Sequence, residues 1–234
     1  MGSTAPEKLS REAPSTREEI VKSAARHFAE NGFKGASLRE ILRDAGANIA
    51  AGHYYFGSKQ ELYREVVSRY LVKLCAERQR ALDEIMRKEH HTPRDRVAAL
   101  VRAYVEPHIR LCGDPNARHY VQLLARFVTE KEELTGRIYT DILEPTRTRY
   151  LKAIAAAAPH IPDSELTRLF SFMVSLMVTA PADSSYRSLT GRSPWPKQPQ
   201  RLIEQITSFV TAGMLGAAER RERRRLHLRA DHAD

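Results

Sequence analysis

The chain has 234 residues, of which 42% are hydrophobic and 29% charged, which suits one large or two small domains with a hydrophobic core. No stretch reaches the ~20 consecutive apolar residues of a membrane span, and the polar N-terminus lacks the apolar segment of a secretory signal. Cys75 and Cys112 form neither a CxxC motif nor a disulfide framework. We therefore expect a cytoplasmic protein with no membrane partner.

The net charge of +9 permits a polyanionic partner but does not identify one. The positive charge is not concentrated at the N-terminal end, because residues 1–60 hold nine basic and seven acidic side chains. The nine histidines show no metal-binding spacing, and the sequence contains no nucleophile–base pair and no glycine-rich phosphate loop. The sequence therefore predicts no catalytic residue, no metal site and no cofactor.

Polar composition and two prolines predict a disordered arm over residues 1–14. Ser15 or Thr16 then begins the first helix, since each is followed three residues later by a glutamate in a capping-box pattern. Apolar residues recur with helical spacing after this point. Asn31–Gly32 is a typical C-terminal signal and predicts the end of the helix.

Three further helix starts follow closely, at the N-cap residues Ser37, Asn48 and Ser58. Gly46 ends the helix that Ser37 begins, so only a tight turn separates it from a short third helix over about 49–55. Two short helices joined by such a turn, with a helix before them, predict a helix-turn-helix DNA-binding domain over residues 15–60.

Residues 61–225 show longer helical periodicities, which predict a larger helical bundle there. The predicted fold class is all-α with about nine helices, and residues 226–234 are a polar tail. The later helices are expected at about 59–89, from 93 onward, and at about 116–129, 131–157, 164–182 and 199–225. Pro107 should kink the helix that begins at 93, and Pro145 lies inside the helix over 131–157. A loop is expected over 183–198.

The segment SLREILRDAGANIAAGHYYFGSKQELYREVV resembles the N-terminal domain of TetR/AcrR-type transcriptional regulators. This resemblance implies a homodimeric repressor whose third helix enters the major groove of a palindromic double-stranded DNA operator and which a small ligand releases. The matching residues are the Ser37 cap, Ile41, Ala45–Gly46, Phe56, Gly57–Ser58–Lys59 and Leu62.

Small and flat polar side chains suit a helix that enters a groove about 12 Å wide. His53 stands where the family usually has tyrosine, and Gly52 stands where it usually has an apolar core residue. A glycine there leaves a hole unless Ile49 or Tyr55 turns inward, so Ile49 has two alternative orientations, toward DNA or toward the core. The resemblance places the DNA contacts at Ser37, Asn48, Ile49, Ala51, His53, Tyr54 and Lys59, the last at a helix N-terminus that suits a phosphate.

The resemblance also implies a small-molecule pocket in the bundle and a four-helix dimer interface from helices 164–182 and 199–225. The segment AAAAPHIPDSELTRLFSFMVSLMV, together with NIAAGHYYFGSK, is similar to PsrA-like regulators that respond to long-chain fatty acids, which implies an apolar effector. The candidate ligand-binding residues are Leu74, Tyr104, Leu123, Phe127, Met173 and Met177 for the apolar body, with Arg126 or His108 for a carboxylate.

Two alternatives stay open. The chain is either such a regulator or a helical carrier or enzyme whose helix-turn-helix is vestigial. The run ERRERRRLHLR over residues 219–229 is either a DNA-contacting arm or a solvated helix end whose charges compensate the helix dipole.

Overall fold

The computed structural model describes residues 15–89, 92–114, 117–128, 132–182, 191 and 198–230. Within these ranges the chain forms helices and no strands, which confirms the all-α prediction. The predicted arm over 1–14, most of the loop over 183–198 and the last four residues lie outside the described ranges. Side chains after Ala217 are also outside them, so the arginine-rich run has a described backbone only.

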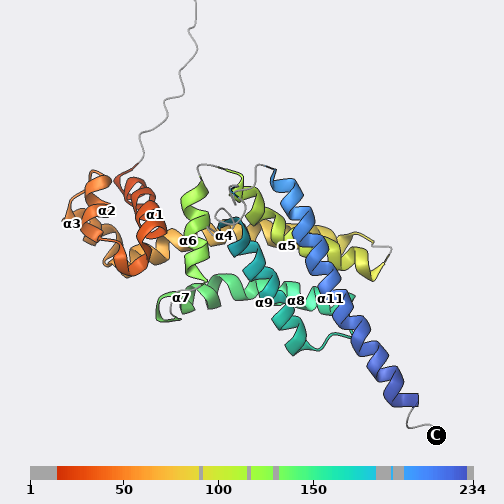
Figure 1. Ribbon diagram of the computed structural model, residues 1–234. Coiled ribbons are helices and arrows are strands. Elements are labelled where there is room, and N and C mark those ends of the chain that lie inside the picture. Colours follow the sequence, from red (N-terminus) through yellow and green to blue (C-terminus); the bar gives the residue numbers. More distant parts are fainter. Residues whose placement is uncertain are drawn as a thin grey trace, which may run out of the picture.

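The helices α1, α2 and α3 gather at one end of the molecule, and the last helix, α11, runs along the opposite side and extends beyond the bundle (Figure 1). A π-helical turn (Tyr139–Leu143) and a short 3-10 turn (Ala180–Ala182) complete the chain. The α-helices are α1 (Thr16–Gly35), α2 (Leu38–Asp44), α3 (Ile49–Phe56), α4 (Lys59–Arg87), α5 (Pro93–Cys112), α6 (Arg118–Phe127), α7 (Glu132–Ile138), α8 (Glu144–Ala157), α9 (Asp163–Thr179) and α11 (Pro199–Ala230).

Side-chain caps begin the first five helices. Ser37, Asn48 and Ser58 are caps as predicted, Ser15 is the cap of α1, and Thr92 is the cap of α5. Each cap oxygen accepts the backbone N–H three residues ahead, which satisfies a donor that has no partner inside the helix. The N–H to oxygen distances are 3.3 Å for Ser15, 3.4 Å for Ser37, 2.8 Å for Asn48, 3.1 Å for Ser58 and 3.1 Å for Thr92.

Three helix predictions need correction. The chain leaves helical geometry at Gly32, whose φ is 69° and ψ 175°, but one more turn follows, to Gly35. Pro145 does not lie inside a single helix, because it occupies the first turn of α8 directly after the π-helical turn; the missing proline N–H is tolerated at that position. α11 continues to Ala230, so the first part of the predicted polar tail is helical.

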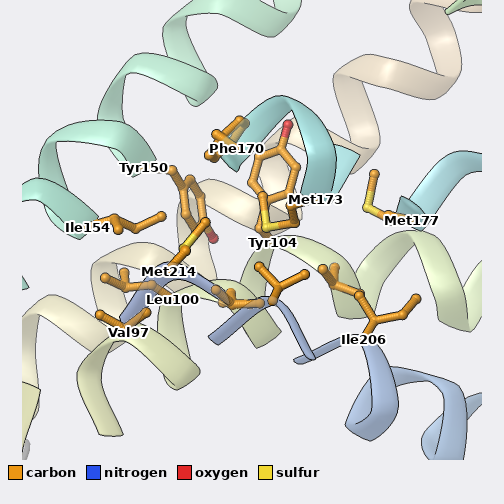
Figure 2. Close-up of a cluster of buried hydrophobic side chains, with 14 of the residues drawn as sticks. Val97, Leu100, Tyr104, Tyr150, Ile154, Phe170, Met173, Met177, Ile206 and Met214 are labelled. Atoms are coloured by element: carbon orange, nitrogen blue, oxygen red, sulfur yellow. The ribbon is translucent and has the colours of Figure 1, made fainter. Parts of the chain in front are cut away.

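The buried side chains form two clusters. The first joins α1, α2 and α3 to the first half of α4 and is completed by residues of α6 and α7, among them Leu123, Phe127 and Ile138. The second joins α5, α8, α9 and α11 around Tyr104, and Figure 2 shows Met173 within it. The predicted domain boundary at residue 60 is therefore crossed by a shared core.

Gly52 does not leave a hole in the helix-turn-helix. It is buried, and a methyl group placed on it would lie 2.7 Å from Cδ1 of Leu42, so Leu42 already fills the space that a side chain would take. Neither of the two expected substitutes turns inward, because Ile49 is 55% and Tyr55 39% exposed. The glycine thus lets α3 approach α2 closely and leaves Ile49 on the outer surface.

We expect Gly52→Ala to destabilise the protein by about 1 kcal/mol, because overpacking costs more than the helix propensity gained. Leu42 is only 1% exposed and has little room to move. In a Leu42→Ala background the clash disappears, and the same substitution should raise the free energy of unfolding. Urea unfolding of the four proteins measures this; an equal effect in both backgrounds would contradict the close packing.

Candidate nucleic-acid interface and ligand cavity

The outer face of α3 carries most of the residues predicted to contact DNA. Tyr54 is 83% exposed, and Ile49 and His53 are also exposed, while Ala51 is half-buried. Nδ1 of His53 lies 2.9 Å from the backbone oxygen of Gly57. A carbonyl oxygen only accepts, so Nδ1 carries the proton and Nε2 of a neutral ring is left as an acceptor for a donor outside the helix. Asn48 is exposed at the start of the same helix, where it forms the cap.

Lys59 joins the start of α4 to the segment between α1 and α2. Its ammonium donates to the backbone oxygen of Ala36 at 2.7 Å and lies 4.8 Å from the ring centre of Phe33. It therefore ties the start of α4 to the segment between α1 and α2, a role that the sequence did not indicate. An ammonium has three donors, so the bond to Ala36 leaves capacity for a phosphate. Ser37 is half-buried, and its hydroxyl oxygen caps α2.

An ion-pair cluster connects α1 to the end of α2. Asp44 accepts hydrogen bonds from Arg26 at 2.8 Å and from His27 at 2.9 Å, with Arg43 also within 3.3 Å. The hydrogen bond from His27, helped by Arg43, lowers the pKa of Asp44 below its usual value. The cluster thus joins α1 to the end of α2, the helix on which α3 packs.

Three basic side chains of α1 and α2 were not among the predicted DNA contacts. Lys34, Arg39 and Arg43 are exposed on α1 and α2, and these two helices lie with α3 at one end of the molecule (Figure 1). The signal was present, since each lies off the apolar stripe of its helix. Exposed cations at this end favour a polyanion such as the DNA backbone.

A cavity of about 660 Å³ lies in the larger part of the chain, within the usual size range of small-molecule sites. Its walls come from α4, α5, α6, α7, α8 and α9 with the π-helical turn. Of the eight residues predicted to bind a ligand, the structure brings five together along this cavity. They are Leu74, Tyr104, His108, Phe127 and Met177.

The other three predicted ligand-binding residues lie elsewhere. Leu123 packs in the first buried cluster and Met173 in the second, where Figure 2 shows it in the core with Tyr104. Arg126 donates from Nε to the backbone oxygen of Ala29 at 2.7 Å and from Nη2 to that of Glu30 at 2.9 Å. It thus connects α6 to α1 instead of reaching a ligand.

Arg78 is the buried charged residue among the cavity residues that were not predicted from the sequence. It is 2% exposed, its Nε donates to the backbone oxygen of Tyr104 at 2.8 Å, and its guanidinium lies 3.8 Å from the Tyr104 ring centre. Tyr150 donates its hydroxyl to the backbone oxygen of Arg78 at 2.8 Å. The signal was its spacing, because Leu71, Leu74, Arg78 and Leu82 share one apolar face of α4.

His108 lies one helical turn after Tyr104 on α5 and is fully buried. Neither ring nitrogen has a hydrogen-bond partner among the described residues. Burial, assisted by the positive charge of Arg78, lowers the pKa of His108 to about 3. The ring is therefore neutral at ordinary pH and presents one donor and one acceptor.

Acid should weaken the ligand-free protein through His108. The unfolded chain binds a proton near pH 6.5 while the folded site resists it to about pH 3, so stability falls as pH falls through this window. Between pH 7 and pH 5 this amounts to about 2 kcal/mol. Urea unfolding at both pH values should show that His108→Leu loses about that much less than the wild type. Equal losses would mean that the histidine is not buried as a neutral ring.

Among the described residues, no group of three or more His, Cys, Asp or Glu side chains is placed to hold a metal ion. In the same part of the chain, no helix has both the length and the apolar character to cross a membrane. Cys75 and Cys112 are buried free thiols.

Two family descriptions match the chain. "Bacterial regulatory proteins, tetR family" matches residues 20–66, and "Tetracyclin repressor-like, C-terminal domain" matches residues 102–213. These ranges contain α3 and most of the cavity wall respectively.

Two proteins named as transcriptional regulators are similar to part of this chain. The HTH-type transcriptional regulator BetI of Rhizobium meliloti is 36% identical over 89 residues, which span 38% of this chain and 41% of that relative. The probable HTH-type transcriptional regulator YttP of Bacillus subtilis is 41% identical over 56 residues, 24% of this chain and 27% of that protein. The matched part is thus well under half the length of either relative.

Solved structures share the fold over nearly the whole chain. A TetR-like transcriptional regulator from Rhodococcus sp. RHA1 aligns with a TM-score of 0.56 at 18% identity, covering 88% of this chain and 100% of that one. A putative TetR-family regulator from Mesorhizobium loti aligns with a TM-score of 0.54 at 16% identity, covering 86% and 95%.

Proposed function

The chain belongs to the TetR family of bacterial regulators, and from that premise we propose that it is a ligand-responsive repressor that binds an operator in double-stranded DNA. The observation that carries the proposal is the outer face of α3. Ile49, His53 and Tyr54 project from a short capped helix that Gly52 seats closely on Leu42. Such a helix fits the major groove.

A homodimer would present two such helices. α9 and α11 pack against each other, and each carries a large exposed aromatic ring, Phe172 at 61% and Phe209 at 72%. Gly213 on α11 has open space where a side chain would point, which allows a close helix approach. We propose that these helices form the subunit interface. A twofold axis then requires a palindromic operator with half-sites about 34 Å apart or a multiple of this.

The effector proposal rests on the cavity and on the similarity to PsrA-like regulators. The cavity is lined by aliphatic and aromatic side chains such as Leu74, Phe127 and Phe170, and an elongated apolar body suits them. A fatty acid or another acyl compound is the first candidate.

Two connections link this cavity to the DNA-binding end. The first is α4, which begins at Lys59, where the ammonium bonds to Ala36, and which lines the cavity at Leu71, Leu74 and Arg78. On α6, Phe127 lines the cavity while its neighbour Arg126 bonds to α1. A ligand that prefers a different position of α4 and α6 would change the separation of the two α3 helices. A hundredfold release needs about 2.7 kcal/mol of coupling.

Selection of tight binders from a random duplex-DNA library, at two salt concentrations, tests DNA recognition. We expect a palindrome whose binding falls steeply with salt, because phosphate contacts release counterions. Tyr54→Ala should weaken binding to it by about 10- to 100-fold, the usual range for one specific contact. Tyr54 is a cleaner choice than Lys59, whose loss also removes the tie to Ala36.

The matched control is Met86→Ala, which removes an exposed side chain near the far end of α4. It should bind the recovered operator like the wild type, and both variants should unfold at the wild-type temperature. Recovery of only sequence-independent, salt-sensitive binding would overturn the repressor proposal and favour a carrier.

Arg126→Gln should weaken communication between the cavity and the operator, because it removes the two hydrogen bonds that join α6 to α1. We expect the ratio of operator Kd values with and without decanoate to fall several-fold toward one. Fluorescence anisotropy with labelled operator measures it. Arg149→Gln, which alters an exposed ion pair to Asp83, should keep the wild-type ratio; an unchanged ratio in Arg126→Gln would contradict the linkage.

A further inference from the structure

Arg78 is a buried charge that has no counter-ion among the described residues. It is 2% exposed, and no carboxylate of the described chain lies within 4 Å of its guanidinium. Its contacts are the backbone oxygen of Tyr104, the ring of Tyr104, and Sδ of Met177 at 3.3 Å from Nη2. All three partners are neutral.

These contacts compensate the charge only in part. An unpaired ion in a protein interior costs several kcal/mol even after relaxation. A buried ring face offsets only part of this cost, and a thioether is a weak acceptor. An anion beside Arg78 would replace the Met177 sulfur with a charged oxygen and form stronger hydrogen bonds.

The remaining charges of the cavity point to the same partner. Among the described residues that line it there are three arginines and no aspartate or glutamate. Arg147 is already paired with Glu144 at 3.0 Å, and Arg137 is exposed. Arg78 is therefore the buried positive charge that the cavity leaves unpaired, and it suits one negative charge.

We propose that the cavity selects a small apolar carboxylic acid, with the carboxylate on the guanidinium of Arg78 and a second hydrogen bond from His108. The inference rests on the proposed function in that it names the effector of the same cavity. A single carboxylate balances the single charge, whereas a phosphate dianion would leave a buried negative charge and an amine would repel Arg78. The apolar body lies against Leu74, Phe127 and Phe170.

The geometry assigns a role to each nitrogen. Nε of Arg78 is occupied by the Tyr104 oxygen, so the terminal nitrogens are left for the acid, and Nη2 would exchange the Met177 sulfur for a carboxylate oxygen. Tyr104 and His108 are one turn apart on α5, which brings the imidazole to the same side of the helix. The unpartnered ring N–H of His108 can then donate to the second carboxylate oxygen.

Calorimetric titration of the purified full chain with matched head groups tests the inference. The first series is decanoate, decan-1-ol and decylamine, and the second is 4-butylbenzoate and 4-butylbenzyl alcohol. We expect at least one acid to bind tenfold or more tighter than its alcohol, and decylamine to bind weakest. Equal binding of both acids and their alcohols, or tighter binding of the amine, would overturn the inference.

Arg78→Met should abolish the preference for the acid, because it keeps the shape and removes the charge. Arg80→Met is the matched control, since Arg80 lies two residues away on α4 and is exposed, and it should keep the preference. The ligand-free Arg78→Met protein should also unfold at a higher temperature than the wild type, as replacement of an uncompensated buried charge allows. A preference that survives in Arg78→Met would overturn the assignment.

If Arg78→Met fails to fold, Arg78→Lys keeps the charge and should keep the acid preference at reduced affinity. The head-group series on the wild type stands without any variant. Binding is read without DNA, so the two proposals fail separately. An acid that binds through Arg78 but leaves the operator complex intact would count against the proposed regulation alone, and an operator complex with no acid preference would count against this inference alone.

Discussion

The structure depends on one constraint, that α4 belongs to two cores at once. It is 29 residues long, or about 43 Å at 1.5 Å per residue. Leu62 and Val66 pack in the cluster of the helix-turn-helix, whereas Leu82 packs in the second cluster. Between them, Leu74 and Arg78 line the cavity. A continuous hydrogen-bonded helix does not bend easily between these points. A shift at one end must therefore be accommodated at the other, by rearrangement of side chains that are packed at crystal-like density.

The local features of the fold could be predicted, because the physics that sets them is local. A cap such as Ser58 bonds to an N–H three residues away, so the helix start is encoded in four residues. The orientation of Ile49 was not encoded in this way. It follows from the contact between Gly52 and Leu42, which are ten positions apart and meet only after α2 and α3 have packed. The family pattern indicated an apolar residue at 52, and the structure supplies that bulk from α2.

The kinds of residue that line the ligand cavity could be predicted from the sequence, but the buried arginine that lies in the cavity could not. Arg126 could be expected to meet an acid, yet its partners are backbone oxygens of α1, 96 and 97 residues away. Arg78 lies on an apolar stripe, where long cationic side chains usually extend to solvent. Its burial results from α5 and α9 covering it with Tyr104 and Met177, a consequence of tertiary packing that helical periodicity does not contain.

The position of Arg78 on α4 also bears on how binding energy would be used. An anchor on α9 would hold the ligand against the helix that is proposed to form the dimer interface, and most of the binding energy would stabilise both arrangements equally. A ligand changes an equilibrium only by its differential affinity for the two states. An anchor on α4 places the strongest ligand contact on the helix that begins at Lys59, whose ammonium bonds to Ala36. If that contact is stronger in one position of α4 than in another, the ligand favours that position, and α3 moves with the start of the helix.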